Sequence, residues 1–336
     1  MKTRTYSPTP ANLRRLAKAL QQGELVAIPT ETVYGLAAHA LDEKACRKIF
    51  AAKGRPTRDP LIVHVLDLSH AEELAEFNDT ARRAAKKFWP GPLTLVLPKK
   101  SCVPGIVTAE RSTVAIRSPS HPLTRKLLQL AGVPLAAPSA NLFGYVSPTS
   151  AAHVLDGLSG KIPYVLEGGD SSVGVESTIV DLTDPAKPKI LRPGSITASE
   201  LAKALRIKVR QHTGKNVTGM KKGLLAPGML SQHYSPRTRL LIKTDLTDLP
   251  SETGGIFLRE PRARSTRNVY WLSTRASLKE IAHNLYGVLR TADHAGHREI
   301  WIEALPENSG ELAIAVNDRI RRAATKATSR SRKSNQ

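Results

Sequence analysis

Cysteine is almost absent from the sequence, which has two in 336 residues, Cys46 and Cys102. Neither stands in a CxxC or mixed Cys/His spacing, which excludes a zinc site of the usual spacing and a disulfide framework. No apolar run approaches the length that spans a bilayer, and the charged N-terminal segment lacks the apolar centre of a signal peptide. These absences predict a cytoplasmic protein without membrane segments.

Common nucleotide-binding signatures are absent as well. Neither a GxxxxGKS/T loop nor a GxGxxG turn occurs, and no catalytic-triad motif appears, so a bound nucleotide must be held by side chains from many segments. Acidic residues are scarce, with 29 Asp and Glu against 50 Lys and Arg and a net charge of +21. This excess predicts a polyanionic partner, such as a nucleotide, RNA or an acidic surface, without choosing among them.

What the sequence does contain is a regular alternation of helical and extended patterns, which predicts α/β architecture. With 40% hydrophobic residues the chain can bury one large core or two moderate ones. The expected helices cover residues 13–20, 42–52, 71–76, 80–88, 121–130, a segment from about 148, 198–205, 278–289 and a basic helix around Arg319. The expected strands cover residues 24–28, 61–65, 93–97, 113–117, 134–137, a segment near 164, 177–182, a segment near 190, 240–243, 255–258, 269–272 and 299–303.

Charge divides the chain into parts. Between Leu201 and Thr244 there is no acidic residue, whereas ten Lys and Arg side chains occur there, a pattern typical of a linker. We therefore expect a first domain over residues 1–206, a basic linker over 207–239 and a small α/β domain over 240–325. The last segment, residues 326–336, is predicted to be a basic disordered tail.

The segment IPTETVYGL, followed some twenty residues later by Lys53, Gly54 and Arg55, is the most informative stretch. Glu31 and Thr32 follow a strand end, where ligands of α/β proteins bind, although TET could equally cap a helix. Lys53 and Arg55 lie on a loop where both heads could converge on phosphate oxygens. The alternative is a pair of solvated loop cations.

Polar side chains recur beside other expected strands. Ser139 and Asn141 in APSANLFGYVSPTS can point the same way from an extended segment and hold phosphate oxygens, or they are ordinary turn residues. His64 within LIVHV either lines a pocket or is a hydrogen-bonded core histidine. Arg117 ends the strand TVAIR and either clamps a carboxylate or marks a surface terminus.

Near the end of the first domain, Ser177 and Arg192 stand beside glycine-rich turns in GGDSSVGVESTIVDL and ILRPG. A hydroxyl and a guanidinium near flexible backbone suit a small polar ligand. An ordinary hairpin would look similar.

Six motifs together resemble the YrdC-like domain in order and spacing. They are IPTETVYGL, AAKGRPTRDPLIVHV, STVAIR, APSANLFGYVSPT, VESTIVD and LRPG. LLAPGMLSQHYSP, and the segment from NLYGVLRTAD to AVNDRIRRAA, resemble the linker and C-terminal domain of the full-length, Sua5-type members of the YrdC/Sua5 family. The likeness covers roughly residues 7 to 325. It implies a YrdC-like domain with a twisted mixed sheet around an open cleft, plus a small Rossmann-like C-terminal domain.

The resemblance implies a nucleotidyltransferase reaction. L-threonine, bicarbonate and ATP condense to L-threonylcarbamoyladenylate with release of pyrophosphate, which is the first step toward N6-threonylcarbamoyladenosine in tRNA. Mg²⁺ is expected to bridge the ATP phosphates rather than to sit in an all-protein cage. No residue is named as a general base. The product would pass to the tRNA threonylcarbamoyl-transfer machinery, and the basic chain could contact tRNA.

The resemblance also implies roles for single residues. Those expected around threonine are Thr32, His64, Arg117, Ala137 and Ser177. Those expected around ATP are Lys53, Arg55, Asp59, Thr113, Ser139, Asn141, Ser147, Arg192 and Tyr234, with Lys53 and Arg55 also catalytic. Asp59 departs from the family pattern, which usually has asparagine there, so it is either tolerated or changes a nucleotide contact.

Three further expectations complete the interpretation. The linker with Tyr234 is predicted to close over ATP as a lid, so truncation at residue 206 should impair synthesis. A non-catalytic RNA-binding module is the alternative function, and it would explain the charge but not the set of hydroxyl and amide side chains. A carbamoyl-transfer maturation factor would need cysteine-rich zinc modules, which two cysteines exclude.

Overall fold

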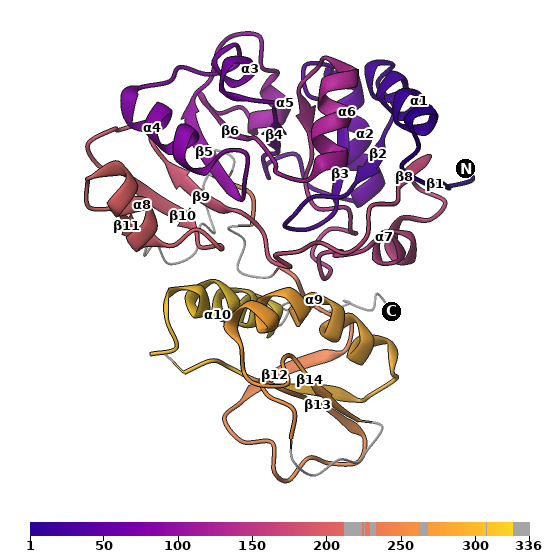
Figure 1. Ribbon diagram of the computed structural model, residues 1–336. Helices are drawn as coiled ribbons and strands as arrows, with labels where there is room; N and C mark the ends of the chain where they lie inside the picture. The colour runs from indigo at the N-terminus through magenta and orange to yellow at the C-terminus, as the bar shows by residue number, and fades with distance from the viewer. Residues whose placement is uncertain (212–223, 225, 229–232, 262–267, 307, 325–336) are drawn as a thin grey trace, which may run out of the picture.

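The structure is a computed structural model that describes residues 1–211, 224, 226–228, 233–261, 268–306 and 308–324. It consists of a large mixed-sheet unit and a smaller unit with a parallel sheet (Figure 1). This arrangement confirms the predicted α/β fold. The predicted tail over 326–336 lies outside the described residues, as do residues 212–223, 225 and 229–232 of the predicted linker.

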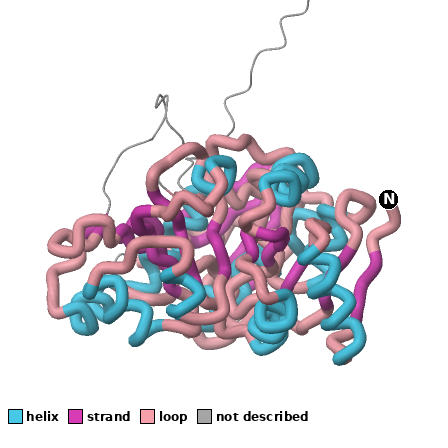
Figure 2. Tube along the Cα trace, turned by 90° about the horizontal axis from the view of Figure 1, so that it is seen from above, coloured by secondary structure: helices cyan, strands magenta, loops and turns pink. Residues whose placement is uncertain are grey.

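The described residues of the large unit form a mixed sheet in the spatial order β1-β8-β2-β3-β7-β4-β6-β5-β9-β10-β11. Its strands are β1 (Arg4–Tyr6), β2 (Val26–Ile28), β3 (Gly35–His39), β4 (Ile62–His64), β5 (Leu93–Pro98), β6 (Thr113–Arg117), β7 (Leu135–Ala136), β8 (Tyr164–Leu166), β9 (Thr178–Asp181), β10 (Lys189–Arg192) and β11 (Arg210–Gln211). Its helices are α1 (Pro10–Gln21), α2 (Glu43–Lys53), α3 (Leu68–Glu72), α4 (Asp79–Phe88), α5 (Gly105–Thr108), α6 (Pro122–Ala131), α7 (Ala151–Leu158) and α8 (Ala198–Leu205). Seen from above, most helices surround the strands (Figure 2).

Strand directions bring three predicted site residues to one edge of the sheet. β4 and β6 are parallel and pair His64 with Arg117 at their carboxyl ends. β5 is antiparallel to β6 and parallel to β9, so the start of β9, just after Ser177, lies at the edge where β6 ends. β10 runs antiparallel to β9 and ends with Arg192 at the same edge.

Local sequence signals explain where helix α2 begins and why it ends at Lys53. The Asp42 side chain accepts hydrogen bonds from the backbone N–H groups of Lys44 and Ala45, which begins the helix. Gly54 ends it in the left-handed conformation, with φ of 62°. Lys53 is therefore the last residue of a rigid helix, and Arg55 begins the loop that follows.

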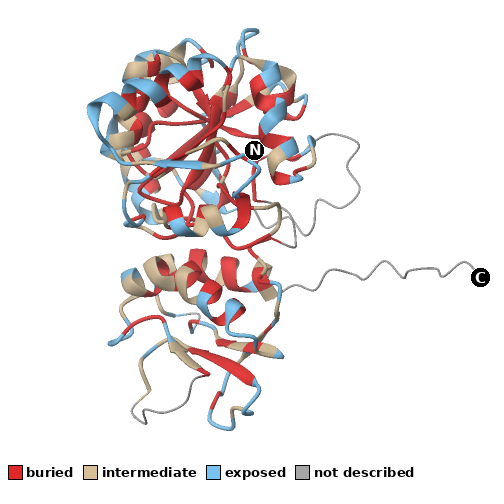
Figure 3. Ribbon diagram, turned by 90° about the vertical axis from the view of Figure 1, so that its right-hand side faces the viewer, coloured by how far each residue is buried: buried red, intermediate tan, exposed pale blue. Residues whose placement is uncertain are grey.

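The smaller unit places its helices on one face of its sheet. Strands β12 (Arg239–Lys243), β13 (Thr253–Phe257), β14 (Val269–Trp271) and β15 (Glu299–Glu303) are all parallel, in the order β12-β15-β13-β14. Helices α9 (Leu278–His294) and α10 (Glu311–Ala324) lie between this sheet and the large unit (Figures 1 and 3). The apolar core of the smaller unit continues into Val33, Tyr145, Val146 and Val175 of the large one. The two units therefore share buried surface.

Several expected elements differ from the structure. The helix expected over 71–76 lies instead at Leu68–Glu72, because Asp67 caps it by accepting from the N–H of His70. The helix expected from about 148 begins at Ala151, where Ser150 is the cap. Strands β1 and β3 were not expected from the sequence. No helix among the described residues is long and apolar enough to cross a membrane.

Candidate active site

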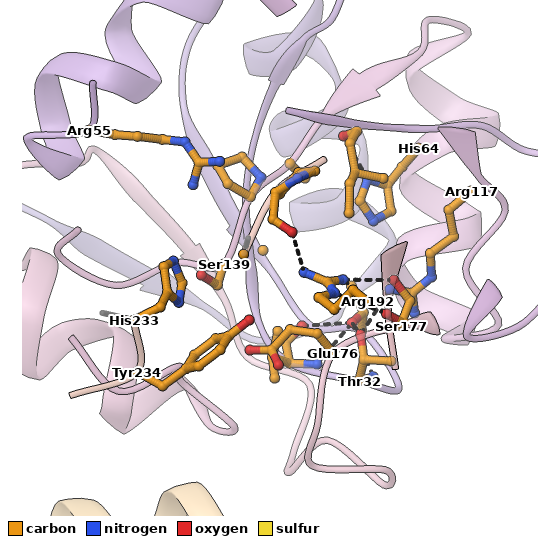
Figure 4. A pocket seen from close by; sticks show the side chains of 18 residues that line it. Thr32, Arg55, His64, Arg117, Ser139, Glu176, Ser177, Arg192, His233 and Tyr234 are labelled. Carbon is orange, nitrogen blue, oxygen red and sulfur yellow. Dashed lines mark hydrogen bonds between the residues drawn. The ribbon is translucent and has the colours of Figure 1, made fainter. Parts of the chain in front are cut away.

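A narrow pocket of about 50 Å³ opens where the large sheet, the 137–139 loop and described linker residues meet (Figure 4). Eight of the predicted site residues line it directly, together with the predicted linker tyrosine Tyr234. The lining consists of Thr30, Thr32, Val33, Gly35, Arg55, Ile62, His64, Arg117, Ala137, Pro138, Ser139, Glu176, Ser177, Arg192, Pro227, Gly228, His233 and Tyr234.

Thr32 and Arg117 line one side of the pocket, and Glu31, which is outside the lining, pairs with Arg117. Arg117 Nη1 donates to Thr32 Oγ1 at 2.9 Å, and its Nη2 lies 2.7 Å from Glu31 Oε1. Burial opposes ionisation of Glu31, but the charge and hydrogen bond of Arg117 outweigh it and lower the pKa of the carboxyl. Arg117 is 3% exposed, so it is no surface terminus, and β3 rather than a helix follows Thr32.

His64 lines the pocket and is buried at the same time. Its Nδ1 lies 3.3 Å from the carbonyl oxygen of Ile62. Burial, reinforced by the positive charge of Arg117, lowers the pKa of His64 to about 3. The imidazole is therefore neutral at physiological pH and presents an uncharged polar edge beside the guanidinium.

Ser177 and Arg192 are joined across the β9–β10 hairpin. Arg192 donates from Nε and Nη2 to the carbonyl oxygen of Ser177, at 3.1 and 3.0 Å, and from Nη2 to its Oγ at 3.1 Å. The hydroxyl of Ser177 also lies 2.8 Å from Thr94 Oγ1. Both predicted residues are thus in the pocket, and the planar guanidinium fixes the position of the serine.

Lys53 is not a solvated cation but is 2% exposed behind the pocket wall. Its Nζ donates to the carbonyl oxygens of Ser139 and Asn141, so it holds the loop that carries both predicted ATP residues. Burial first, and the charge of Arg55 second, lower the pKa of the ammonium well below its ordinary value. Asn141 is buried too, and its amide donates to the carbonyl oxygens of Leu142 and Tyr145.

Arg55 and Asp59 are paired beside this ammonium. Arg55 Nη2 lies 3.0 Å from Asp59 Oδ1, and the same side chain donates to the carbonyl oxygens of Asp59 and Pro60. Burial raises the pKa of Asp59, although Arg55, Lys53 and Arg192 oppose this rise. Arg55 reaches the pocket, whereas Asp59 lies behind it.

Thr113 lies apart from the other predicted ATP residues. It lines a second, wider hollow of about 720 Å³, together with Arg58, Arg111 and Asp181. The two hollows share no lining residue. Linker residue Leu224 accepts a hydrogen bond from Arg111 at 2.9 Å, and Pro227 accepts one from Arg192 at 3.4 Å. The described linker residues therefore contact the walls of both hollows.

Tyr234 extends from the linker into the pocket, with the ring of His233 4.1 Å away (Figure 4). The backbone of Tyr234 has φ of 66°, a strained conformation for a residue with a side chain. Gly228 passes so close that a Cβ there would lie 2.8 Å from Tyr234 Oη and 3.2 Å from Arg192 Nη1. This glycine is what allows the linker to approach both side chains.

Sequence reasoning gave no role to Glu176, which lines the pocket directly before Ser177. Its Oε1 accepts a hydrogen bond of 2.7 Å from Ser147 Oγ, the predicted ATP residue. A glutamate within VESTIVD, one of the motifs quoted above, was the available signal. Its other partners come from the smaller unit, more than 100 residues away, and no local pattern indicates them.

The described residues contain no group of three or more His, Cys, Asp or Glu side chains placed to hold a metal ion. The two carboxylates at the pocket, Glu31 and Glu176, are each paired with an arginine.

The fold and the site define a class of two-domain YrdC-type proteins. Hydroxyls and guanidiniums line a pocket in a mixed α/β unit, a buried lysine holds one of its loops, and a parallel-sheet unit packs against it. Residues 18–194 match the Sua5/YciO/YrdC family model, described as telomere recombination, and residues 196–325 match the C-terminal domain of threonylcarbamoyl-AMP synthase. The chain belongs to the Sua5/YciO/YrdC family, in its two-domain form.

Similar proteins extend over nearly the whole chain. It is 41% identical to a threonylcarbamoyl-AMP synthase of Pyrococcus abyssi (strain GE5 / Orsay) over 327 residues, covering 93% of each chain. It is 38% identical to that of Bacillus subtilis (strain 168), covering 96% of this chain and 95% of the relative. The crystal structure of P. abyssi Sua5 complexed with L-threonine matches with a TM-score of 0.85 and 37% identity, over 96% of this chain and 98% of that one.

Proposed function

We propose that the protein is an L-threonylcarbamoyladenylate synthase, which joins L-threonine, bicarbonate and ATP and releases pyrophosphate. Relatives that are 41% and 38% identical over almost the full length carry this name, and a matching structure holds L-threonine. The product is the activated intermediate for N6-threonylcarbamoyladenosine in tRNA. The tRNA threonylcarbamoyl-transfer machinery would receive it, and direct contact of this chain with tRNA is a further expectation.

The observation that carries this proposal is the group formed by Thr32, Arg117 and Ser177, which all line the same pocket. Its guanidinium can bind the carboxylate of an amino acid, and its two hydroxyls can bind the amino acid's own hydroxyl or amine. His64, neutral because of its lowered pKa, can accept or donate one hydrogen bond without adding charge. Ala137 leaves room beside them for a small side chain.

We assign the nucleotide to the cationic side of the site. Arg55 and Arg192 can contact phosphate oxygens, while Lys53 holds the loop of Ser139 and Asn141 in place. Tyr234 would contact the nucleotide from the linker, and Thr113 from the second hollow. Ser147, which is buried next to the lining residue Glu176, is assigned to the nucleotide by the resemblance alone. Mg²⁺ carried on the phosphates would neutralise part of their charge.

The chemistry follows from bringing two anions together. Condensation of the threonine amine with bicarbonate gives a carbamate and water, and a carbamate oxygen then attacks the α-phosphorus of ATP. The bond to the pyrophosphate oxygen breaks, and pyrophosphate leaves with the electron pair. Arg55 and Arg192 would offset the repulsion and stabilise the developing charge, so positioning and electrostatics supply most of the rate.

The described linker residues narrow the pocket to about 50 Å³, whereas sites for ligands of this size usually have several hundred. We infer that Gly228 and Tyr234 shift outward to admit ATP and return over it. In that closed position the linker would keep water away from the product, L-threonylcarbamoyladenylate, which is a mixed anhydride that water hydrolyses.

Pyrophosphate release tests the function. The full-length protein is incubated with ATP, Mg²⁺ and bicarbonate, with L-threonine, with L-serine or without an amino acid. We expect release that depends on threonine, is weaker with serine, and falls at least about 100-fold in Arg192→Ala, which removes one phosphate contact. Binding of RNA without binding of ATP or threonine would instead favour the RNA-binding alternative.

A further inference from the structure

Glu176 sits at the meeting point of the two units and of the pocket. Its Oε1 accepts from Ser147 Oγ at 2.7 Å and from Tyr286 Oη at 3.1 Å, and its Oε2 accepts from Tyr286 Oη at 2.9 Å. Arg319 Nε donates to Oε2 at 2.9 Å. Tyr286 belongs to α9 and Arg319 to α10, so two of the three residues that bind this carboxylate come from the smaller unit.

Arg319 contacts three separate segments that carry pocket residues. Beyond Glu176, its Nη1 donates to the carbonyl oxygen of Pro193 at 2.8 Å, directly after Arg192. Its guanidinium carbon lies 5.5 Å from the ring centroid of Tyr234, where a cation–π contact forms. At 1% exposed, this arginine is closed off from solvent.

Tyr286 also packs against the linker tyrosine. Its ring centroid lies 5.7 Å from that of Tyr234, with the ring planes tilted by 30°. The backbone of Tyr234 is in the strained left-handed region, so its position must be imposed by neighbours rather than by local preference. Arg319 and Tyr286 are two of those neighbours.

We propose that Arg319 and Tyr286 are positioning residues of the synthase site, acting through Glu176 and Tyr234, so that the smaller unit completes the pocket of the larger one. This inference rests on the proposed function. The residues placed by this cluster, Ser177 next to Glu176 and Tyr234 on the linker, are those assigned to threonine and to ATP. Neither Arg319 nor Tyr286 is expected to touch a substrate.

A purely structural role would not require this arrangement. A buried ion pair is about as stable as a well-packed apolar pair, so stability alone does not explain why a charged pair stands against the pocket. The Glu176 carboxyl keeps its charge because Arg319, Arg192 and Ser147 together outweigh burial and lower its pKa to about 2. The carboxylate is therefore a fixed acceptor that holds several donors in one geometry.

The test uses full-length variants and steady-state kinetics. Tyr286→Phe removes the hydroxyl that reaches both Glu176 oxygens but keeps the ring beside Tyr234. Arg319→Lys keeps the charge but loses the planar fork. We expect threonine kcat/KM to fall about tenfold in the first and about 100-fold in the second, since small displacements of reacting groups have such effects.

Asp156→Asn is the matched control. Asp156 pairs with Arg290 at 2.9 Å across the same two units, Arg290 is as buried as Arg319, and Asp156 does not line the pocket. We expect this variant to lose thermal stability but to keep kcat/KM within about twofold at temperatures where it is folded. The double variant Tyr286→Phe/Arg319→Lys should lose little more than Arg319→Lys alone, because both act through Glu176.

The outcomes separate the two proposals. Two results would overturn the positioning role. One is wild-type kinetics in both Tyr286→Phe and Arg319→Lys. The other is a fall in kcat/KM that follows the fall in melting temperature in all three variants, Asp156→Asn included. If the wild-type protein releases no pyrophosphate, the proposed function fails, and L-threonine and ATP binding by calorimetry then decides the inference. Binding weakened in Tyr286→Phe and Arg319→Lys but not in Asp156→Asn supports it, and unchanged or absent binding overturns it.

Discussion

Asp59 and Arg55 form an ion pair of 3.0 Å in which both side chains are almost closed to solvent, at 0% and 3% exposed. The pair lies beside Lys53, whose ammonium holds the 139–141 loop. A carboxylate at this position occupies one edge of an arginine that we assign to phosphate binding. We therefore expect Asp59 to compete with ATP for Arg55 and to repel phosphate.

Asp59→Asn should consequently have opposite effects on binding and on stability. The amide leaves Arg55 next to Lys53 without a counter-charge, which should lower the free energy of unfolding by roughly 3 kcal/mol. It also frees the guanidinium and removes a negative charge, so ATP should bind several-fold more tightly. Calorimetric titration and urea unfolding measure the two effects.

The control for this prediction is Glu72→Gln. Glu72 pairs with Arg82 at 2.7 Å on the surface, with both side chains about two-fifths exposed, so its loss should cost under about 1 kcal/mol. Weaker ATP binding in Asp59→Asn would show instead that the carboxylate orients Arg55 for the nucleotide.

Local signals account for the parts of the fold that were predicted well. Helix α8 was expected over 198–205 and lies at Ala198–Leu205. Its start is set by a reciprocal capping box between Thr197 and Glu200, which are only three residues apart in the sequence. Strand β1 was missed, because its three residues pair with Tyr164–Leu166, some 160 positions later in the chain. Pairing over such a distance leaves no mark in the three residues of β1.

The same distinction applies to the site. Arg117 could be proposed from the sequence because it ends a strand, and Ser177 because it stands beside a glycine-rich turn. Glu176 could not be linked to Arg319, since 143 residues separate them and both would read as ordinary charged residues. The contact of Lys53 with two main-chain carbonyls was equally hidden, because carbonyl positions depend on the fold and not on side-chain type.

Buried neutral histidines should make stability fall on mild acidification. Burial lowers the pKa of His64 and of His233 to about 3, and that of His153 to about 4, from an ordinary value of 6.5. Below pH 6.5 these histidines bind protons in the unfolded chain but stay neutral in the folded chain. The free energy of unfolding therefore decreases as pH falls. Each such histidine contributes up to about 2 kcal/mol of this loss by pH 5.

His64→Gln tests this dependence. Urea unfolding of the variant should show a smaller difference between pH 7.5 and pH 5 than that of the wild type, by up to about 2 kcal/mol. His70→Gln, at a half-buried position of α3, serves as the control and should retain the wild-type difference. An unchanged pH dependence in His64→Gln would mean that the imidazole is charged in the folded protein.

Arg117→Lys should separate threonine binding from nucleotide binding. The arginine contacts Gly91, Thr32 and Glu31 at once, at 3.2, 2.9 and 2.7 Å, and a single ammonium cannot span all three. We expect KM for threonine to rise about 10- to 100-fold, with KM for ATP changed less than about threefold. Equal rises in the KM values for threonine and for ATP would show that Arg117 does not belong to a threonine site that is separate from the nucleotide site.

Gly228→Ala should hinder the return of the linker over the pocket. The added Cβ would lie 2.8 Å from Tyr234 Oη and 3.2 Å from Arg192 Nη1, and φ of 77° adds strain of about 1 kcal/mol. Gly132→Ala is the matched control, because its φ is 63° with nothing within 4 Å of the added carbon. We expect kcat/KM for ATP to fall at least about tenfold in the first variant and to stay unchanged in the second.

Truncation at residue 206 would remove the linker together with Arg319 and Tyr286, so only the point substitution isolates the linker. Equal activities of the two glycine variants would show that the close approach of Gly228 to Tyr234 has no part in the reaction.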